Sequence, residues 1–197
     1  MSRLNYIFLF LFFPLFLAAQ KDSVDVKKEI VINNKRFRVY NSWVSGGVGL
    51  AYHSVDPRTQ TMLGVNFNFH IKQYYFRLGT MFSGDVFGLW NNFQAHACWI
   101  PYRTDQVKYH LAMMAGASYS TGYPYLYAGT FDNIHPYKET GLYLEVQYIR
   151  KLFFDVGGGG ALFANINKQN TIIGVRADIY LSGAYKGYVK GKEPHHM

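Results

Sequence analysis

The sequence predicts an all-β protein, an eight-stranded antiparallel transmembrane β-barrel with a short N-terminal periplasmic extension. Three observations predict this class. The chain opens with an export-type apolar segment, it then alternates apolar and polar residues with a period of two, and no useful helical period follows the opening segment. Charged residues make up 16% of the chain, well below the roughly one quarter of soluble domains, which fits a chain that turns one face to lipid.

The first segment, residues 1–19, is predicted to be a cleaved signal peptide. Arg3 gives it a positive start, Tyr6 to Leu17 is an almost unbroken apolar run, and Ala18-Ala19 offers small residues for cleavage. The run is shorter than the ~20 residues that a membrane-spanning helix needs. Because Cys98 is the only cysteine, the exported fold must be stable without an internal disulfide.

The second segment, residues 20–41, is predicted to be basic and periplasmic. It carries six lysines and arginines against three acidic residues, in a chain of formal net charge +8. β-branched runs on both sides of Asn33-Asn34 predict a hairpin over residues 29–40. On an exported chain this basic balance favours anionic lipid or polysaccharide as a partner and argues against nucleic acid.

The third segment, residues 42–182, is predicted to be the barrel. Its clearest strand places Ile173 and Val175 on one face and Arg176 and Asp178 on the other. Segments of 10–13 residues are long enough to cross a bilayer at a tilt, whereas soluble strands average about 5–6 residues. Single-chain bacterial barrels have an even number of strands. The eight predicted strands span 42–54, 60–70, 73–83, 88–100, 107–119, 140–149, 152–164 and 171–182.

Alternation alone also fits a soluble β-sandwich, whose apolar face points inward. Aromatic residues near the predicted strand ends, such as Trp43, Trp90 and Trp99, favour the membrane barrel because they would form interfacial girdles. The signal, the eight alternating strands and the girdle aromatics together resemble the small eight-stranded outer-membrane barrels of the OmpA/OmpX type. The resemblance covers residues 42–182 and implies a Gram-negative outer membrane.

With both termini in the periplasm, strand parity assigns the connections. Periplasmic turns are predicted at 71–72, 101–106 and 150–151, and outer loops at 55–59, 84–87, 120–139 and 165–170. The last segment, residues 183–197, is predicted to be a flexible periplasmic tail.

The barrel lumen is predicted to be filled, because eight strands leave an interior just wide enough for side chains. A porin-like channel is therefore not expected. Two inward arginines are expected to pair with three inward carboxylates as a polar plug, since an unpaired buried charge is costly, and a proton or ion path is the alternative. The predicted network consists of Arg77, Glu145, Asp155, Arg176 and Asp178.

A metal site is a weaker possibility. His96 and Cys98 share the inward face, and a turn at 101–106 would set His96 opposite His110, giving three soft ligands for zinc or copper. Buried thiols and hydrogen-bonded histidines are the more common explanation. No cofactor is predicted.

The sequence favours a non-enzymatic function, as a structural or binding protein or as an accessory subunit of a larger outer-membrane complex for assembly, secretion or surface attachment. The expected partners are outer-membrane lipid and an outer-membrane or periplasmic protein. Tyrosine-rich loops suit recognition because tyrosine is large and amphipathic and loses little conformational entropy when it is fixed in an interface. Binding is therefore predicted at Tyr123, Tyr125, Tyr127, Phe131 and Tyr137, unless these aromatics pack as a cap over the barrel.

The alternative function is a lipid-modifying barrel enzyme, an acyl hydrolase or transferase. Such an enzyme needs a nucleophile and a base at one rim. His53 and Ser54 end the first strand, and His135 lies in the long outer loop. No motif fixes their spacing, so they are candidates by residue type alone.

Overall fold

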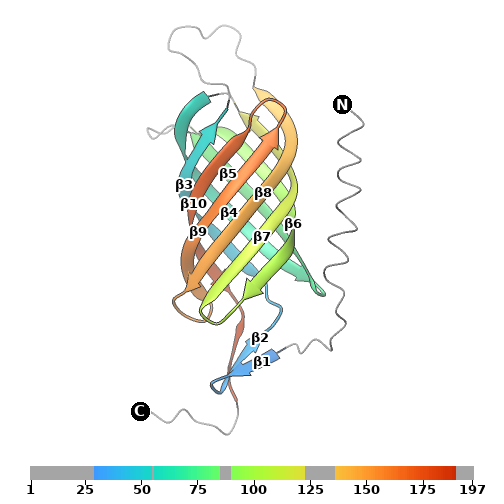
Figure 1. Cartoon of the computed structure of the whole chain (residues 1–197), viewed down its shortest axis with the longest axis vertical. Coiled ribbons are helices and arrows are strands. Elements are labelled where there is room, and N and C mark those ends of the chain that lie inside the picture. The colour runs from blue at the N-terminus through green and yellow to red at the C-terminus, as the bar shows by residue number, and fades with distance from the viewer. Residues whose placement is uncertain (1–28, 55, 85–89, 123–135, 190–197) are drawn as a thin grey trace.

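The computed structural model describes residues 29–54, 56–84, 90–122 and 136–189. The predicted signal peptide lies outside these residues. The described chain folds into a barrel and a small sheet beneath it (Figure 1). No helix in the described part of the chain is long and apolar enough to span a bilayer.

Eight antiparallel strands close the barrel in the order β10-β3-β4-β5-β6-β7-β8-β9, so the first and last barrel strands pair. This confirms the predicted all-β, eight-stranded closed barrel. The strands are β3 (Trp43–His53), β4 (Asp56–Ile71), β5 (Tyr74–Gly84), β6 (Trp90–Asp105), β7 (Tyr109–Gly122), β8 (Tyr137–Lys151), β9 (Val156–Asn167) and β10 (Ile172–Ser182).

The polarity of the barrel is the reverse of that in a water-soluble domain. Along β8, Leu144 and Val146 point outward and are exposed, whereas Tyr143, Glu145 and Gln147 point inward and are buried. Each of the other strands shows the same alternation, because successive side chains of a strand point to opposite faces. The outer wall is therefore apolar and the lumen is polar.

The structure corrects the predicted turn at 101–106. Strand β6 continues to Asp105, and a bulge between Trp99 and Tyr102 inserts one extra residue relative to β7. A bulge reverses the inward and outward parity of the residues that follow it. The alternation of apolar and polar residues is interrupted at this bulge, so the sequence pattern predicts a shorter strand than the structure contains.

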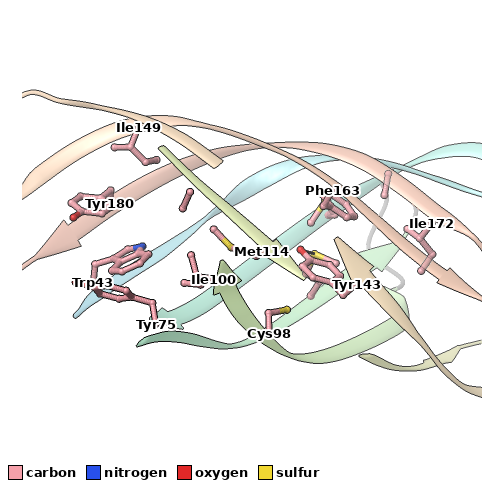
Figure 2. Close-up of a cluster of buried hydrophobic side chains, with 14 residues drawn as sticks. Trp43, Tyr75, Cys98, Ile100, Met114, Tyr143, Ile149, Phe163, Ile172 and Tyr180 are labelled. Atoms are coloured by element: carbon pink, nitrogen blue, oxygen red, sulfur yellow. Dashed lines mark hydrogen bonds between the residues drawn. The ribbon is translucent and has the colours of Figure 1, made fainter. Parts of the chain in front are cut away.

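Aromatic and apolar side chains fill the parts of the lumen that polar groups leave (Figure 2). At one end Trp43, Tyr75 and Tyr180 lie together, and towards the other end Tyr143 packs near Phe163. All five are at most 6% exposed. The lumen is therefore a packed core.

The small sheet has the order β1-β2-β11, with β1 (Glu29–Ile32), β2 (Lys35–Arg38) and β11 (Tyr185–Tyr188). The predicted hairpin is present, and its turn residues Asn33 and Asn34 have φ of 50° and 60°. Asparagine tolerates this left-handed region, which two-residue hairpins of type I′ require at both positions.

The structure also corrects the expectation of a flexible tail from residue 183, because Tyr185–Tyr188 is the third strand of the small sheet. Aromatic contacts hold this third strand in position. The ring of Phe154, in the turn between β8 and β9, stacks on Tyr185 at 4.6 Å and meets Phe37 edge-on at 5.5 Å. Residues 190–197 lie outside the described residues.

Candidate functional site

The barrel has a sheet end, which carries β1, β2 and β11, and an opposite end, the loop end. Polar side chains run through the lumen from one end to the other in three clusters. The first lies in the middle of the barrel, the second closes the sheet end, and the third lies at the loop end.

Arg77 on β5 is the centre of the middle cluster. Its guanidinium forms an ion pair with Glu145 on β8, donates to Asn68 Oδ1 at 2.6 Å, and donates to Gln147 Oε1 at 3.0 Å. All of these side chains are at most 2% exposed. The contacts to Glu145 and Gln147 cross the lumen from β5 to β8, which are not neighbours, so they fix the shape of the barrel interior.

Arg176 on β10 completes the middle cluster. Its guanidinium donates to Glu145 Oε1 at 3.1 Å and to the two oxygens of Asp178 at 2.5 and 3.0 Å. Gly64 on β4 makes room for it, because a Cβ at that position would lie 2.9 Å from Arg176 Nη1. Two arginines thus face two carboxylates, and the buried charge of these four residues is balanced.

Asp155 does not belong to this network, contrary to the sequence prediction. It lies in the turn before β9, which begins at Val156, so the inward parity assumed from residue 152 does not apply to it. Its carboxylate instead accepts the backbone N–H groups of Ala184 at 2.7 Å and Tyr185 at 3.0 Å. Asp155 therefore joins the barrel to the small sheet.

The second cluster closes the sheet end. Asp105 on β6 accepts from Arg103 at 2.6 Å and from Lys151 at 2.6 Å. The guanidinium of Arg103 lies over the rings of Trp43 and Tyr75, 4.6 and 4.4 Å from their centroids. Cation–π contacts of this kind stabilise the charge of an arginine that is removed from water. Charged side chains and aromatic rings together fill this end of the lumen.

The three candidate metal ligands are not brought together. His96 is paired with Ser118 and its Nε2 lies 3.0 Å from Asn66 Oδ1, whereas His110 is paired with Asp105. The predicted opposition of the two histidines is wrong because β6 extends past the position assigned to the turn. Cys98 is a buried free cysteine. Among the described residues, no three His, Cys, Asp or Glu side chains form a group that could hold a metal ion.

The third cluster surrounds His53 at the loop end. The imidazole Nε2 lies 3.0 Å from Ser83 Oγ, and Nδ1 lies 3.1 Å from the side-chain amide of Asn170. The phenol of Tyr137 lies 3.0 Å from the same amide and donates to Asn92 Oδ1 at 2.9 Å. All five side chains are buried.

Ser54, the sequence candidate beside His53, takes no part in this cluster. It is exposed, and its hydroxyl accepts the backbone N–H of Thr171 at 2.8 Å. His135 lies outside the described residues. Sequence reasoning missed Ser83 and Asn170. The alternation along β5 indicates that Ser83 points into the lumen near the end of its strand. Asn170 lies in a connection between strands, where no alternation indicates the direction of its side chain.

Of the five predicted loop aromatics, the structure describes Tyr137, which is 8% exposed and points into the loop-end cluster. Tyr123, Tyr125, Tyr127 and Phe131 lie outside the described residues.

Known structures with the same architecture exist. The crystal structure of Neisserial surface protein A (NspA) matches with a TM-score of 0.56 at 13% identity, over 71% of this chain and 96% of that chain. The N-terminal β-barrel domain of Pseudomonas aeruginosa OprF matches at 0.52 and 12% identity, over 72% and 98%. Ail, the attachment invasion locus protein of Yersinia pestis, matches at 0.48 and 9%, over 74% and 97%.

No family profile and no curated protein sequence matches the chain. At these identities the structural likeness concerns the fold. The chain has the architecture of the small eight-stranded outer-membrane barrels that its sequence resembles.

Proposed function

We propose that this chain is an exported integral protein of a bacterial outer membrane with a structural or binding role. The observation that carries the proposal is the reversed polarity of the barrel. Val48, Leu162 and Ile179 on the outer wall are 63–65% exposed, whereas Arg77 and Glu145 in the lumen are at most 2% exposed. A continuous apolar wall is unfavourable in water and is solvated by lipid.

The proposed orientation places the sheet end in the periplasm. Its three strand connections, residues 72–73, 106–108 and 152–155, are short. The connection between β7 and β8 at the loop end spans residues 123–136. Outer-membrane barrels combine short periplasmic turns with longer external loops, which supports this assignment.

A filled lumen supports a structural or binding role over transport. Service as an accessory subunit is supported by the small sheet, which presents Arg36, Arg38 and Lys186 at a fixed position below the barrel. Such a basic surface suits an acidic periplasmic partner or anionic lipid. On the other side of the membrane, we propose that Tyr123, Tyr125, Tyr127 and Phe131 contact an external partner.

Membrane fractionation followed by native mass measurement tests the proposal. The protein should resist extraction with alkaline carbonate, should be released by mild detergent, and should migrate as a compact form on unheated gels. Recovery in the soluble periplasmic fraction would refute the membrane barrel. A stable particle much larger than one barrel would support the accessory-subunit role, and a single barrel in detergent would refute it.

A further inference from the structure

The loop-end cluster holds a serine, a histidine and an asparagine in the order that activates a nucleophile. Ser83 Oγ lies 3.0 Å from His53 Nε2, and the Asn170 amide lies 3.1 Å from His53 Nδ1. The three residues come from the end of β5, the end of β3 and the connection before β10, and all are at most 7% exposed. A base within hydrogen-bond reach of a hydroxyl, itself oriented by a third group, is the signature of covalent acyl transfer.

We propose that Ser83, His53 and Asn170 form a nucleophile, general base and orienting group that hydrolyse short-chain acyl esters, with acetyl esters as the preferred class. This inference goes beyond the structural and binding role proposed above and does not depend on it. It also differs from the sequence alternative, which paired His53 with Ser54.

The structure places the amide nitrogen of Asn170 3.1 Å from His53 Nδ1, whereas proton transfer from Ser83 requires the amide oxygen at this position. A carboxamide offers its oxygen or its nitrogen in the same volume, so Asn170 Oδ1 can accept from His53 Nδ1–H. The lone pair of His53 Nε2 then faces the hydroxyl of Ser83. Tyr137 lies 3.0 Å from the same Asn170 atom and donates to Asn92 Oδ1 at 2.9 Å, so this exchange requires the carboxamides of Asn92 and Gln60 to be turned over with that of Asn170.

A fourth group supplies a hydrogen-bond donor to the site. Gln94 on β6 is 3% exposed, and its Oε1 accepts from Asn165 Nδ2 at 2.8 Å. Its Nε2 has no hydrogen-bond partner among the described residues. A buried donor without a partner is unfavourable, so it is available to an acceptor that enters the cavity. Such a donor beside a nucleophile is suited to stabilising the oxyanion that forms when an ester carbonyl is attacked.

Ser83 and Gln94 line the same small cavity, and its size selects the acyl group. The cavity measures about 10 Å³, which is room for one group the size of a water molecule. Apart from Ser83, Gln94 and Asn92, its walls are apolar. The methyl group of an acetyl ester matches this volume and polarity, and a long acyl chain exceeds it. The other lining residues are Ala51, Met62, Met81, Phe93, Phe163 and Ile172.

The proposed reaction balances with water as the second reactant. Ser83 Oγ bonds to the acetyl carbon, and its proton passes to His53 Nε2. The bond from carbon to the alcohol oxygen breaks, and that oxygen takes the proton from His53. Water then attacks the acetyl-serine and gives its proton to His53, which returns it to Ser83 as acetate leaves.

A fluorophosphonate probe and nitrophenyl esters test the inference on the full chain in detergent micelles. The probe should add to Ser83, as located by peptide mass mapping. The protein should hydrolyse p-nitrophenyl acetate at least tenfold faster than p-nitrophenyl palmitate. Ser83→Ala should abolish both reactions, and Gln94→Ala should lower kcat about 10²–10³-fold.

Ser45→Ala is the matched control, because Ser45 is also a buried lumen serine but lies outside the loop-end cluster, and its Oγ accepts from Gln147 of the middle cluster. It should keep full activity. Compact migration on unheated gels identifies variants that fold. Absence of an adduct, an adduct on Ser54 or another residue, or unchanged activity of a folded Ser83→Ala variant would overturn the proposal. Preference for the palmitate ester would overturn the assignment of acetyl groups.

Discussion

The carboxylate of Asp155 accepts the backbone N–H of Tyr185 at 3.0 Å, 30 residues further along the chain. It also accepts from the backbone of Ala184 and from the hydroxyl of Ser182. One side chain in a barrel turn therefore satisfies donors in the segment that leaves the last barrel strand. This contact, together with the Phe154 ring, sets the position of the small sheet.

Replacing Asp155 with alanine should release the small sheet while leaving the barrel closed. Two backbone donors lose their acceptor, at a local cost of about 1–3 kcal/mol. Limited proteolysis should cut near residues 182–188 faster than in the wild type. The barrel should keep its compact migration on unheated gels. Asp155→Asn, which retains one acceptor oxygen, should be cut at an intermediate rate, and equal cutting of all three proteins would contradict the assigned role.

Replacing Glu145 with glutamine should strongly destabilise the barrel. The change leaves Arg77 and Arg176 facing a single carboxylate, and removing one partner of a buried ion pair costs about 3–5 kcal/mol. Urea unfolding of the protein in lipid vesicles, followed by tryptophan fluorescence, measures this free energy. Glu139→Gln, on the same strand but outside the middle cluster, should change it by less than about 0.5 kcal/mol. Similar values for the two variants would show that the ion pairs do not stabilise the fold.

Replacing Gly64 with alanine should weaken the barrel because the new Cβ would lie 2.9 Å from Nη1 and 3.2 Å from Cδ of Arg176. Displacing this guanidinium strains its bonds to Glu145 and Asp178, at an expected cost of about 1–3 kcal/mol. Gly158→Ala is the control, since its Cβ would come no closer than 3.8 Å, to the carbonyl oxygen of Asp178. That variant should unfold at the same or a slightly higher urea concentration. A greater loss at Gly158 would contradict the argument.

The ion pair between Glu29 and Lys186 should make the small sheet sensitive to acid. The hydrogen bond from Lys186 lowers the pKa of the exposed Glu29 carboxyl from its ordinary value. A lowered pKa in the folded state gives stabilisation that is present above the unfolded value, about 4.3, and is lost as the pH falls through the folded value. Carboxyl ¹³C shifts measured by NMR should show the lowered pKa in wild-type protein and a return towards the ordinary value in Lys186→Met. Salt should reduce the difference, and identical titrations would refute the pairing.

Much of the barrel follows from local pattern. The alternation of Leu144 and Val146 with Glu145 and Gln147 is visible in the sequence, because a strand that separates lipid from a polar lumen needs it along its whole length. Where a bulge interrupts that period after Trp99, the pattern fails and the strand end is misplaced. A bulge is set by pairing with the neighbouring strand, which the local sequence does not record.

The lumen clusters were less accessible to prediction. Parity places Arg77, Glu145, Arg176 and Asp178 inside but does not say which of them meet across the lumen, since Arg77 and Arg176 reach Glu145 from strands distant in sequence. Asp155 was misplaced because the turn before β9 is longer than the pattern suggested. The contact between His53 and Ser83 spans 30 residues and needs the closed barrel to exist.

The pairing of β2 with β11 ties together the two ends of the barrel segment. Strand β2 precedes the first barrel strand and β11 follows the last, and those two barrel strands close the cylinder against each other. The small sheet therefore joins the two chain segments that flank the paired first and last barrel strands, β3 and β10. A cut or a displacement within this sheet would therefore leave the contact between the first and last barrel strands without support from the segments that flank them.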